Sequence, residues 1–325
     1  MRLRLVPAET NYDFFRYRYV TMGASVVAII ASIILWLVVG LNFGIDFRGG
    51  TTIRTEAVQP VDVGAYRTAV EALDLGDVAI SQVFDPTFGD DQNVSMIRIQ
   101  AQDGQESVTG SVIGDVEVAL KQVDPSLKFT SVESVGPKVS GELIRTALLA
   151  VAAALAAILI YIWLRFEWQF SVGAVAALFH DVILTIGIFS LLQIRFDLAT
   201  IAALLTIVGY SINDTVVIFD RLRENLRKFK TTPLQDIMNK SVNETLSRTL
   251  MTSGTTLLAL IALLILGGDV IRGFVFAITW GVIVGTYSSV YVAKNVVLFL
   301  GVKRDWSKPD GGGGGAGTQF ANIDA

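Results

Sequence analysis

The sequence contains no cysteine and a single histidine, His180. The absence of cysteine excludes disulfide bonds and thiolate metal sites, and one histidine excludes a metal centre built from several imidazoles. No glycine-rich loop ends in Gly-Lys-Ser or Gly-Lys-Thr, so nucleotide-driven work by this chain is not indicated. We therefore expect no metal or other cofactor, no enzymatic activity and no nucleic-acid partner.

Charged residues are scarce at 17% of the chain, whereas hydrophobic residues make up 52% and the mean hydropathy is +0.55. A helix of about 20 apolar residues crosses the hydrocarbon core of a bilayer. The first apolar run is too long for a cleaved signal peptide, so we expect it to be retained as a membrane span. We predict about six spans, at residues 20–41, 143–164, 172–192, the run that begins at Leu198, 250–266 and 274–300.

Between the first two spans lies a polar region, residues 42–142, of about the size of one small domain. Its hydropathy alternates with a strand period or repeats with a helix period in the order strand, helix, strand, strand, helix, strand. This order predicts an α+β ferredoxin-like (βαββαβ) domain. The segments that carry the pattern are residues 51–56, 61–73, 78–84, 94–101, 108–123 and 127–135. Gly49 and Gly50, just before the first strand, predict a backbone turn, and a ligand loop is the weaker alternative.

The distribution of lysine and arginine predicts the orientation in the membrane, because cytoplasmic loops are enriched in both. One side receives the lysines and arginines of residues 1–19, of the connection 220–248 and of the tail 301–325, where they are Lys303, Arg304 and Lys308, and also Arg165. The short loops on the other side contribute only Arg195 and Arg272 to this count. We therefore place both termini in the cytoplasm and the 42–142 domain outside. The glycine-rich tail is typical of a disordered segment.

One carboxylate lies inside the fourth apolar run. Asp214 precedes Asp220 by six residues, which places it roughly 9 Å inside the membrane face of a helix. A buried charge of this kind costs several kcal/mol and is typical of a functional site. Its polar neighbours are Ser211 and Thr215 on the same helical face and Asn213 beside it.

The predicted partner of Asp214 is Arg248, at the cytoplasmic entry of the fifth span. Arg221 shares the face of Asp214 but lies about 10 Å along the axis, which is far for a direct pair. Arg248 and Thr252 form a polar stripe on an antiparallel neighbour. The pair is either a static pin between two helices or a protonatable site, and the cost of the charge favours the second.

A second polar pair, His180 and Asp181, lies about halfway through the third span. Small residues such as Gly173 and Ala177 share the face of His180, which favours an interhelical hydrogen bond in a packing seam. Asp181 is either a second station of a proton path or a structural group, and both interpretations stay open.

The connection between the fourth and fifth spans contains a helix-start pattern at Thr232, Pro233 and Gln235: a cap, a proline in the first turn and a capping-box glutamine. The following apolar residues repeat with a helical period. We expect a separate amphipathic helix at the membrane interface.

Four stretches of the sequence are distinctive: LNFGIDFRGGT at residues 41–51, His180-Asp181-Val182, the block at 200–225 that contains Asn-Asp-Thr, and NETLSRTLMTS at 243–253. Together they resemble the SecF family of bacterial protein-export membrane subunits. The resemblance implies a six-span half of a resistance-nodulation-division-type unit in the bacterial inner membrane, with the outer domain in the periplasm. It also implies pairing with SecD, association with the SecYEG channel and export of unfolded polypeptide driven by the proton motive force. Asp214 and Arg248 occupy the positions implicated in proton passage.

Two other functions compete with this one. The chain is alternatively a half-transporter for small amphiphiles, although about 100 residues is little material for a drug-binding vestibule. The other alternative is a scaffold of the translocation machinery that moves no protons, against which the cost of Asp214 argues.

The predicted orientation is testable because the chain has no cysteine of its own. We expect the Gln105→Cys variant to react with a membrane-impermeant thiol reagent in intact cells, since the 42–142 domain is predicted to lie outside. The Lys228→Cys variant should react only after the cells are opened. The reverse labelling pattern would invert the whole topology.

Overall fold

The computed structural model describes residues 10–302 apart from 77, 84, 86–87, 90–91 and 101–109. The expected disordered tail from residue 303 onward, the first nine residues and the labelling position Gln105 lie outside the described residues.

Six helices in the described part of the chain are long and apolar enough to cross a membrane, which confirms the predicted polytopic helical fold. Five spans are single helices, and the sixth is broken near its end by one π-helical turn. The spans are α1 (Arg18–Val38), α5 (Pro137–Arg165), α6 (Trp168–Leu192), α7 (Leu198–Lys228), α8 (Leu234–Leu266), and α9 (Asp269–Ser288) continued by the π-helix Ser289–Ala293 and α10 (Lys294–Leu300).

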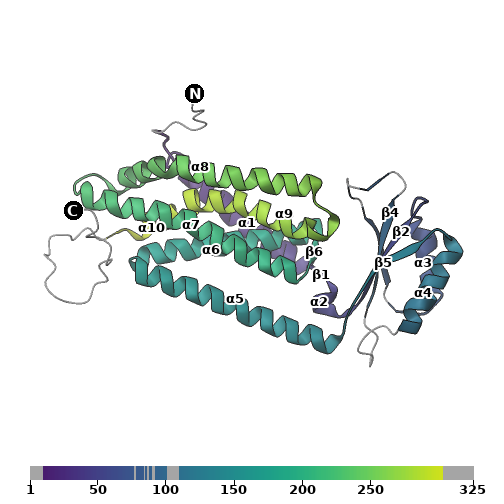
Figure 1. The fold of residues 1–325 in the computed structure, drawn as a ribbon. Coiled ribbons are helices and arrows are strands. Elements are labelled where there is room, and N and C mark those ends of the chain that lie inside the picture. The colour runs from purple at the N-terminus through teal and green to yellow at the C-terminus, as the bar shows by residue number, and fades with distance from the viewer. Residues whose placement is uncertain are drawn as a thin grey trace, which may run out of the picture.

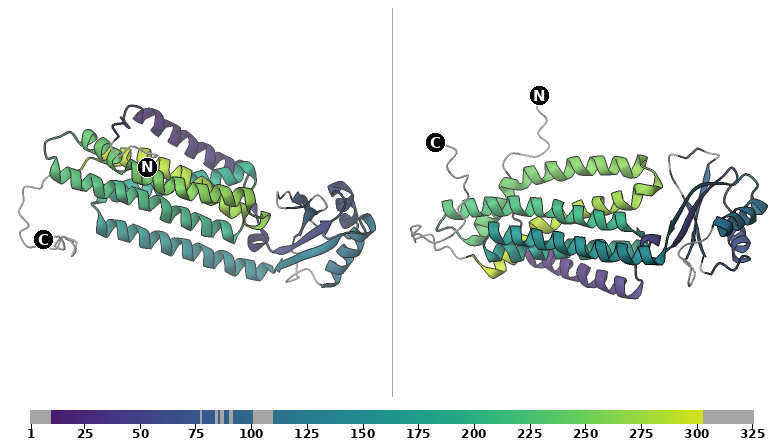
Figure 2. Two further views of the ribbon diagram at one scale, coloured as in Figure 1. Left: turned by 45° about the horizontal axis from the view of Figure 1, so that its top comes forward. Right: turned by 60° about the horizontal axis from the view of Figure 1, so that its bottom comes forward.

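The spans form one bundle with the sheet domain beyond one end (Figure 1). Helices α6, α7 and α9 bury the largest share of their residues, whereas α1 and α5 lie on the outside, as the views in Figure 2 show for α1. Glycines allow the inner helices to approach closely: a Cβ on Gly285 would lie 3.1 Å from the Ser211 Cβ. Gly281 and Gly285 of α9 both lie at the contact with α7, where they face Ile207 and Ser211. The alanine-rich stretch 150–157 of α5, by contrast, is half-buried to exposed in this chain.

The domain between the first two spans has the predicted βαββαβ order. Its four strands form an antiparallel sheet in the order β3-β4-β2-β5, the ferredoxin-like arrangement. Both helices cover the face of the sheet that points away from the bundle (Figure 1), and Ile53, Ile97, Val70 and Leu120 are fully buried between the layers. The elements are β2 (Gly50–Ala57), α3 (Val63–Glu71), β3 (Val78–Val83), β4 (Asn93–Ile99), α4 (Gly110–Val123) and β5 (Lys128–Val135).

The sheet domain is connected to the bundle by a short segment that the sequence did not predict. Strand β1 (Asn42–Phe43) pairs in parallel with β6 (Arg195–Phe196), which comes just before α7, and the one-turn helix α2 (Ile45–Arg48) follows β1. We call residues 42–48 together with 195–198 the joint. Aromatic rings fill it, with the centroids of Phe43 and Phe196 5.9 Å apart.

The joint makes hydrogen bonds in both directions. On the bundle side, Asp46 Oδ2 accepts a 3.1 Å bond from the Leu198 N–H at the start of α7, where free N–H groups need an acceptor. On the sheet side, Arg98 of β4 donates 3.2 Å to the Phe43 carbonyl. Burial, together with the charges of Arg195 and Arg48, lowers the pKa of Arg98. The joint thus connects the sheet to the first turn of α7.

Two glycines lie directly after the first segment of the joint, where the chain enters β2. Gly49 and Gly50 have φ angles of +71° and +125°. Residues with a side chain rarely adopt these angles, so the backbone turn predicted for this pair is confirmed.

The connection between α7 and α8 differs from the sequence prediction. Helix α8 runs without a break from residue 234 to 266. The separate amphipathic helix predicted at the membrane interface is therefore not formed. The apolar face of the first turns of α8 packs into the bundle instead. Pro233 is itself the N-cap, without a side-chain capping bond, and Gln235 accepts a 3.1 Å bond from Arg18. The segment before α1 is held on these same turns: Asn243 Oδ1 accepts a 2.8 Å bond from the Tyr12 N–H.

The packing predicts a difference between two glycine variants. A Cβ on Gly173 would lie 2.8 Å from the Ala293 carbonyl oxygen and 2.7 Å from a Val297 methyl group, whereas a Cβ on Gly254 has nothing within 4 Å. We expect Gly173→Ala to lower the free energy of unfolding by about 1–3 kcal/mol. Gly254→Ala, the matched control, should not lower it. Thermal unfolding of the purified chain in detergent, followed by circular dichroism, measures both, and equal losses would contradict the predicted helix contact.

Candidate functional site

Asp181 is the centre of a buried hydrogen-bond network among three helices. Its side chain is fully buried on α6, and its Oδ2 accepts bonds from Ser211 of α7 at 2.5 Å and from Ser288 of α9 at 2.8 Å. Its Oδ1 lies 2.9 Å from His180 Nδ1. A carboxylate in an apolar bundle is tolerated when protein groups replace its lost hydration, and here both oxygens have partners.

His180 connects this network to α1. Its hydrogen bond goes to the adjacent Asp181 on the same helix, so the interhelical bond predicted for it is replaced by an intrahelical one. Across the helix seam its ring stacks on Tyr287 of α9, with centroids 5.9 Å apart. The Tyr287 hydroxyl donates to the Thr21 carbonyl of α1 at 2.9 Å and lies 3.1 Å from Ser25 Oγ. His180 Nε2 is buried with no partner among the described residues.

Asp214 lies one helical turn beyond Ser211 on α7 and is 3% exposed. Unlike Asp181, it is incompletely satisfied, because its Oδ2 is buried without a hydrogen-bond partner in the described part of the chain. From α8, the Ser253 hydroxyl faces the carboxylate and Arg248 acts on it electrostatically. Ser253 in turn shares a 2.8 Å hydrogen bond with Thr286 of α9.

The other predicted site residues divide into buried and exposed ones. Thr215 is buried beside Asp214, as its shared helical face predicts. Arg248 and Asn213 are exposed on the outer surface of this chain. The Thr252 hydroxyl donates to the Arg248 carbonyl within its own helix at 3.1 Å, so it contributes no interhelical bond. Arg221, set aside as too distant from Asp214, instead pairs with Glu244 at 2.6 Å.

The two carboxylates thus belong to one polar region in the bundle. Ser211 is bonded to Asp181 and lies three residues before Asp214, while Thr286 and Ser288 of α9 contact the two halves of the region. Hydroxyl groups between ionisable side chains are suited to passing protons or to reorienting as charges change. Among the residues the structure describes, no group of three or more histidine, aspartate or glutamate side chains could hold a metal ion.

The sequence prediction missed the residues that α9 contributes. Ser288 and Tyr287 belong to a short polar run, residues 286–289, inside an otherwise apolar span. That run was a usable signal, because polar residues in a membrane helix usually face the interior of the bundle. The partners of these residues lie on other helices and were not accessible from local spacing.

Comparisons with known proteins give a consistent result. The family model "Protein export membrane protein SecD/SecF, C-terminal" matches residues 115–303, and the model "SecD/SecF GG Motif" matches residues 34–61, which include Gly49 and Gly50. The protein translocase subunit SecF of Cereibacter sphaeroides is 68% identical over 324 residues, covering 100% of this chain and 99% of that protein. The SecF subunit of Vibrio alginolyticus is 43% identical, over 94% of this chain and 95% of the relative.

Solved structures agree. The crystal structure of SecDF from Thermus thermophilus, a translocon-associated membrane protein, matches with a TM-score of 0.81 and 36% identity. A structure of SecDF in a super-membrane-facing form matches with a TM-score of 0.65 and 38% identity. In both cases the match covers 92% of this chain but only 40% of the SecDF chain.

Six candidate membrane spans in the described residues, a ferredoxin-like domain beyond one end of the bundle and carboxylates buried between the helices define a multi-pass membrane protein with ionisable groups in its core. Within that class, the chain belongs to the SecF family of protein translocase subunits.

The contrast between the two carboxylates predicts different effects of the same substitution. Asp181→Asn replaces an acceptor of three side-chain bonds with a group that has one acceptor oxygen, so we expect a loss of about 1–3 kcal/mol in unfolding free energy. Asp214→Asn should cost clearly less, because one oxygen is already without a partner. Unfolding of the two variants side by side in detergent checks this, and equal destabilisation would contradict it.

Proposed function

We propose that this chain is an accessory subunit of the Sec protein translocase that acts with SecD and uses the proton motive force to promote export of polypeptides across the inner membrane. The observation that carries the proposal is the state of Asp214: a buried carboxylate with one oxygen unpartnered and a cation on a neighbouring helix. A purely structural pair is not expected to leave a buried oxygen unsatisfied.

The electrostatics of this pair supply a proton-dependent step. When Arg248 is near, the charged carboxylate is favoured, and when α8 withdraws the cation, desolvation favours the protonated form. Each protonation change therefore biases the position of α8. One charge that crosses the membrane potential supplies about 2.3 kcal/mol per 100 mV, enough to shift a two-state element whose states differ by a few kcal/mol.

Asp181 is the second station in this proposal. Ser211 donates to Asp181 and lies one turn from Asp214, so a change in the Asp214 charge acts on a hydroxyl already bonded to Asp181. From there, His180 and Tyr287 continue the polar contacts toward α1. The path uses the chain's own side chains and needs no cofactor or covalent chemistry.

The surface of the bundle supports a membrane partner. Arg248 is exposed on α8, and on α7 the residues that point outward are small or polar and recur every three or four positions: Ala202, Thr206, Gly209 and Asn213. Lipid tails offer no hydrogen-bond partner to the polar residues of this set. A neighbouring helix can offer one, and it can pack closely against the small residues. Since this chain covers only 40% of the solved SecDF chain, we assign this surface to the SecD partner.

The orientation is proposed from the lysine and arginine distribution: termini in the cytoplasm, the sheet domain in the periplasm and the chain in the bacterial inner membrane. The joint gives the carboxylate region a connection to the outside, because Asp46 contacts the first turn of α7 and Arg98 contacts β1. A shift of α7 is thus transmitted to the sheet domain. We propose that this domain acts on unfolded polypeptide leaving the SecYEG channel.

Reconstituted vesicles that contain SecYEG, SecA, SecD and this chain test the mechanism. Asp214→Asn keeps the size of the side chain but cannot release a proton, so we expect normal assembly with SecD and loss of the gradient-dependent stimulation of export. Arg248→Ala should lose the same stimulation, and Arg248→Lys should retain part of it.

The matched control is Asp220→Asn on the same helix, whose carboxylate pairs with Arg165 at 2.8 Å at a half-exposed position. Export by this variant should still respond to the gradient. If Asp214→Asn assembles with SecD and responds fully, Asp214 is a structural pin and the scaffold function is supported instead.

A further inference from the structure

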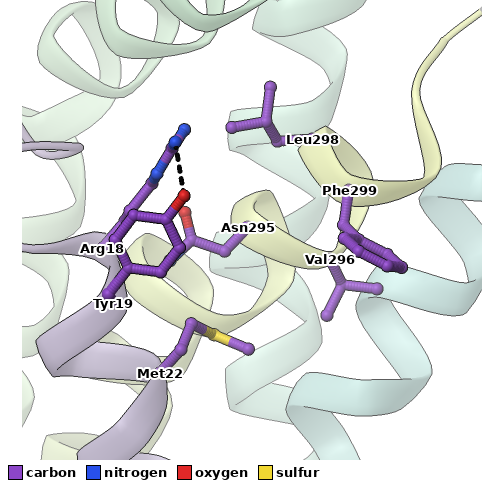
Figure 3. Close-up of a pocket in the computed structure, with 7 residues that line it drawn as sticks. All are labelled: Arg18, Tyr19, Met22, Asn295, Val296, Leu298 and Phe299. Carbon is purple, nitrogen blue, oxygen red and sulfur yellow. Dashed lines mark hydrogen bonds between the residues drawn. The ribbon is translucent and has the colours of Figure 1, made fainter.

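A groove of about 400 Å³ lies between the first turns of α1 and the last turns of the sixth span (Figure 3). Helix α10, which forms part of it, lies at the end of the bundle opposite the sheet domain (Figure 1). Arg18, Tyr19 and Met22 form one wall, and Asn295 and Val296 of α10 form the other. None of these side chains belongs to the carboxylate region in the bundle core.

Asn295 is the unusual member of this lining. It is 8% exposed, and both its Oδ1 and its Nδ2 are buried without a hydrogen-bond partner among the described residues. A buried amide with neither its acceptor nor its donors satisfied is unfavourable, and such groups usually have a partner. Figure 3 shows its side chain directed toward the wall formed by Arg18 and Tyr19. A ligand that both donates and accepts hydrogen bonds would satisfy this amide.

The backbone explains how a polar side chain comes to lie here. The π-helical turn Ser289–Ala293 inserts one extra residue just before α10 and so rotates the residues that follow, a feature common at functional sites. As a result Lys294 points inward, where it donates to the Phe14 carbonyl at 3.0 Å. Its neighbour Asn295 is left at the floor of the groove.

The rim combines a cation with exposed aromatic residues. The Arg18 guanidinium donates to Tyr19 Oη at 2.8 Å and to Gln235 at 3.1 Å, which orients it over the groove. Tyr19 is 78% exposed and Phe299 is 90% exposed. Aromatic and basic residues at the ends of spans are typical of the level of lipid headgroups. Below the rim, Met22 and Val296 are apolar.

We propose that this groove binds one anionic phospholipid. Arg18 pairs with the phosphodiester, and the Asn295 amide donates to a phosphate or ester oxygen while its carbonyl accepts from a headgroup hydroxyl, as in a glycerol headgroup. The acyl chains lie along the apolar wall formed by Met22 and Val296. Basic pockets between membrane helices are suited to such headgroups. A free phosphate would leave the apolar wall without a partner.

Native mass spectrometry of the full chain tests the proposal, alone and as the complex with SecD, in nanodiscs of equal parts phosphatidylglycerol and phosphatidylethanolamine. We expect one phosphatidylglycerol to be retained in both samples. Arg18→Gln should weaken retention about fivefold, since one cation near an anionic headgroup contributes about that much. Asn295→Leu should weaken it as well. Soluble glycerophosphoglycerol, the headgroup without acyl chains, should not displace the lipid.

Two controls separate a lipid site from general effects. Arg16→Gln removes a nearby exposed cation that lies over Tyr17 outside the groove, and it should leave retention unchanged. Val296→Trp fills the groove without removing a polar group, so it should also expel the lipid even if Asn295→Leu folds poorly. Equal retention of the two lipids, or unchanged retention in Val296→Trp, would overturn the proposal. Loss of the lipid only in the complex with SecD would overturn it too, because the groove would then be a helix-docking surface.

Discussion

The arrangement of the bundle depends on the burial of carboxylates away from water. A charge in an apolar interior is tolerated only when neighbouring helices supply hydrogen-bond donors at short range. This requirement explains why the serines that serve Asp181 lie on two different helices, at 2.5 and 2.8 Å from one oxygen. It also explains the close glycine contacts, because a serine side chain is short and its helix must approach until it reaches.

Within this arrangement the two carboxylates differ in how completely they are satisfied. Asp181 has partners on both oxygens, whereas Asp214 has an oxygen without one and a cation that acts on it from an outer helix. A satisfied group stabilises one conformation, while an unsatisfied group lowers the cost of leaving it. The two carboxylates therefore differ in how firmly their surroundings hold them, although only one turn of α7 separates Ser211, which donates to Asp181, from Asp214.

Much of the fold was predictable from local patterns. In the sheet domain, the predicted elements agree with the observed ones within two residues wherever their ends fall on described residues, because alternating and helical periods are properties of short windows. The predicted ends at 84, 101 and 108 lie outside the described residues. The joint was not predictable, since β1 and β6 are two residues long and show no period. Asp214 and Asp181 were evident as charges in apolar runs, but the contribution of Ser288 depends on contacts between distant helices. The continuous α8 was missed because its polar outer face resembles that of an interfacial helix.

The joint also has a consequence for biogenesis. The Asp46 carboxylate and the Leu198 N–H that it contacts are 152 positions apart along the chain, and β1 has its only strand partner, within the described residues, in β6. Ribosomal synthesis and membrane insertion proceed from the N-terminus, so the whole sheet domain and two further spans emerge before β6 does. The sheet domain, which has its own core, is therefore free to fold before the joint closes. At that stage its only side-chain hydrogen bond to α5, within the described residues, runs from Ser140 to the Ile45 carbonyl, and the β1–β6 pairing and the Asp46 contact are added after the third span has been inserted.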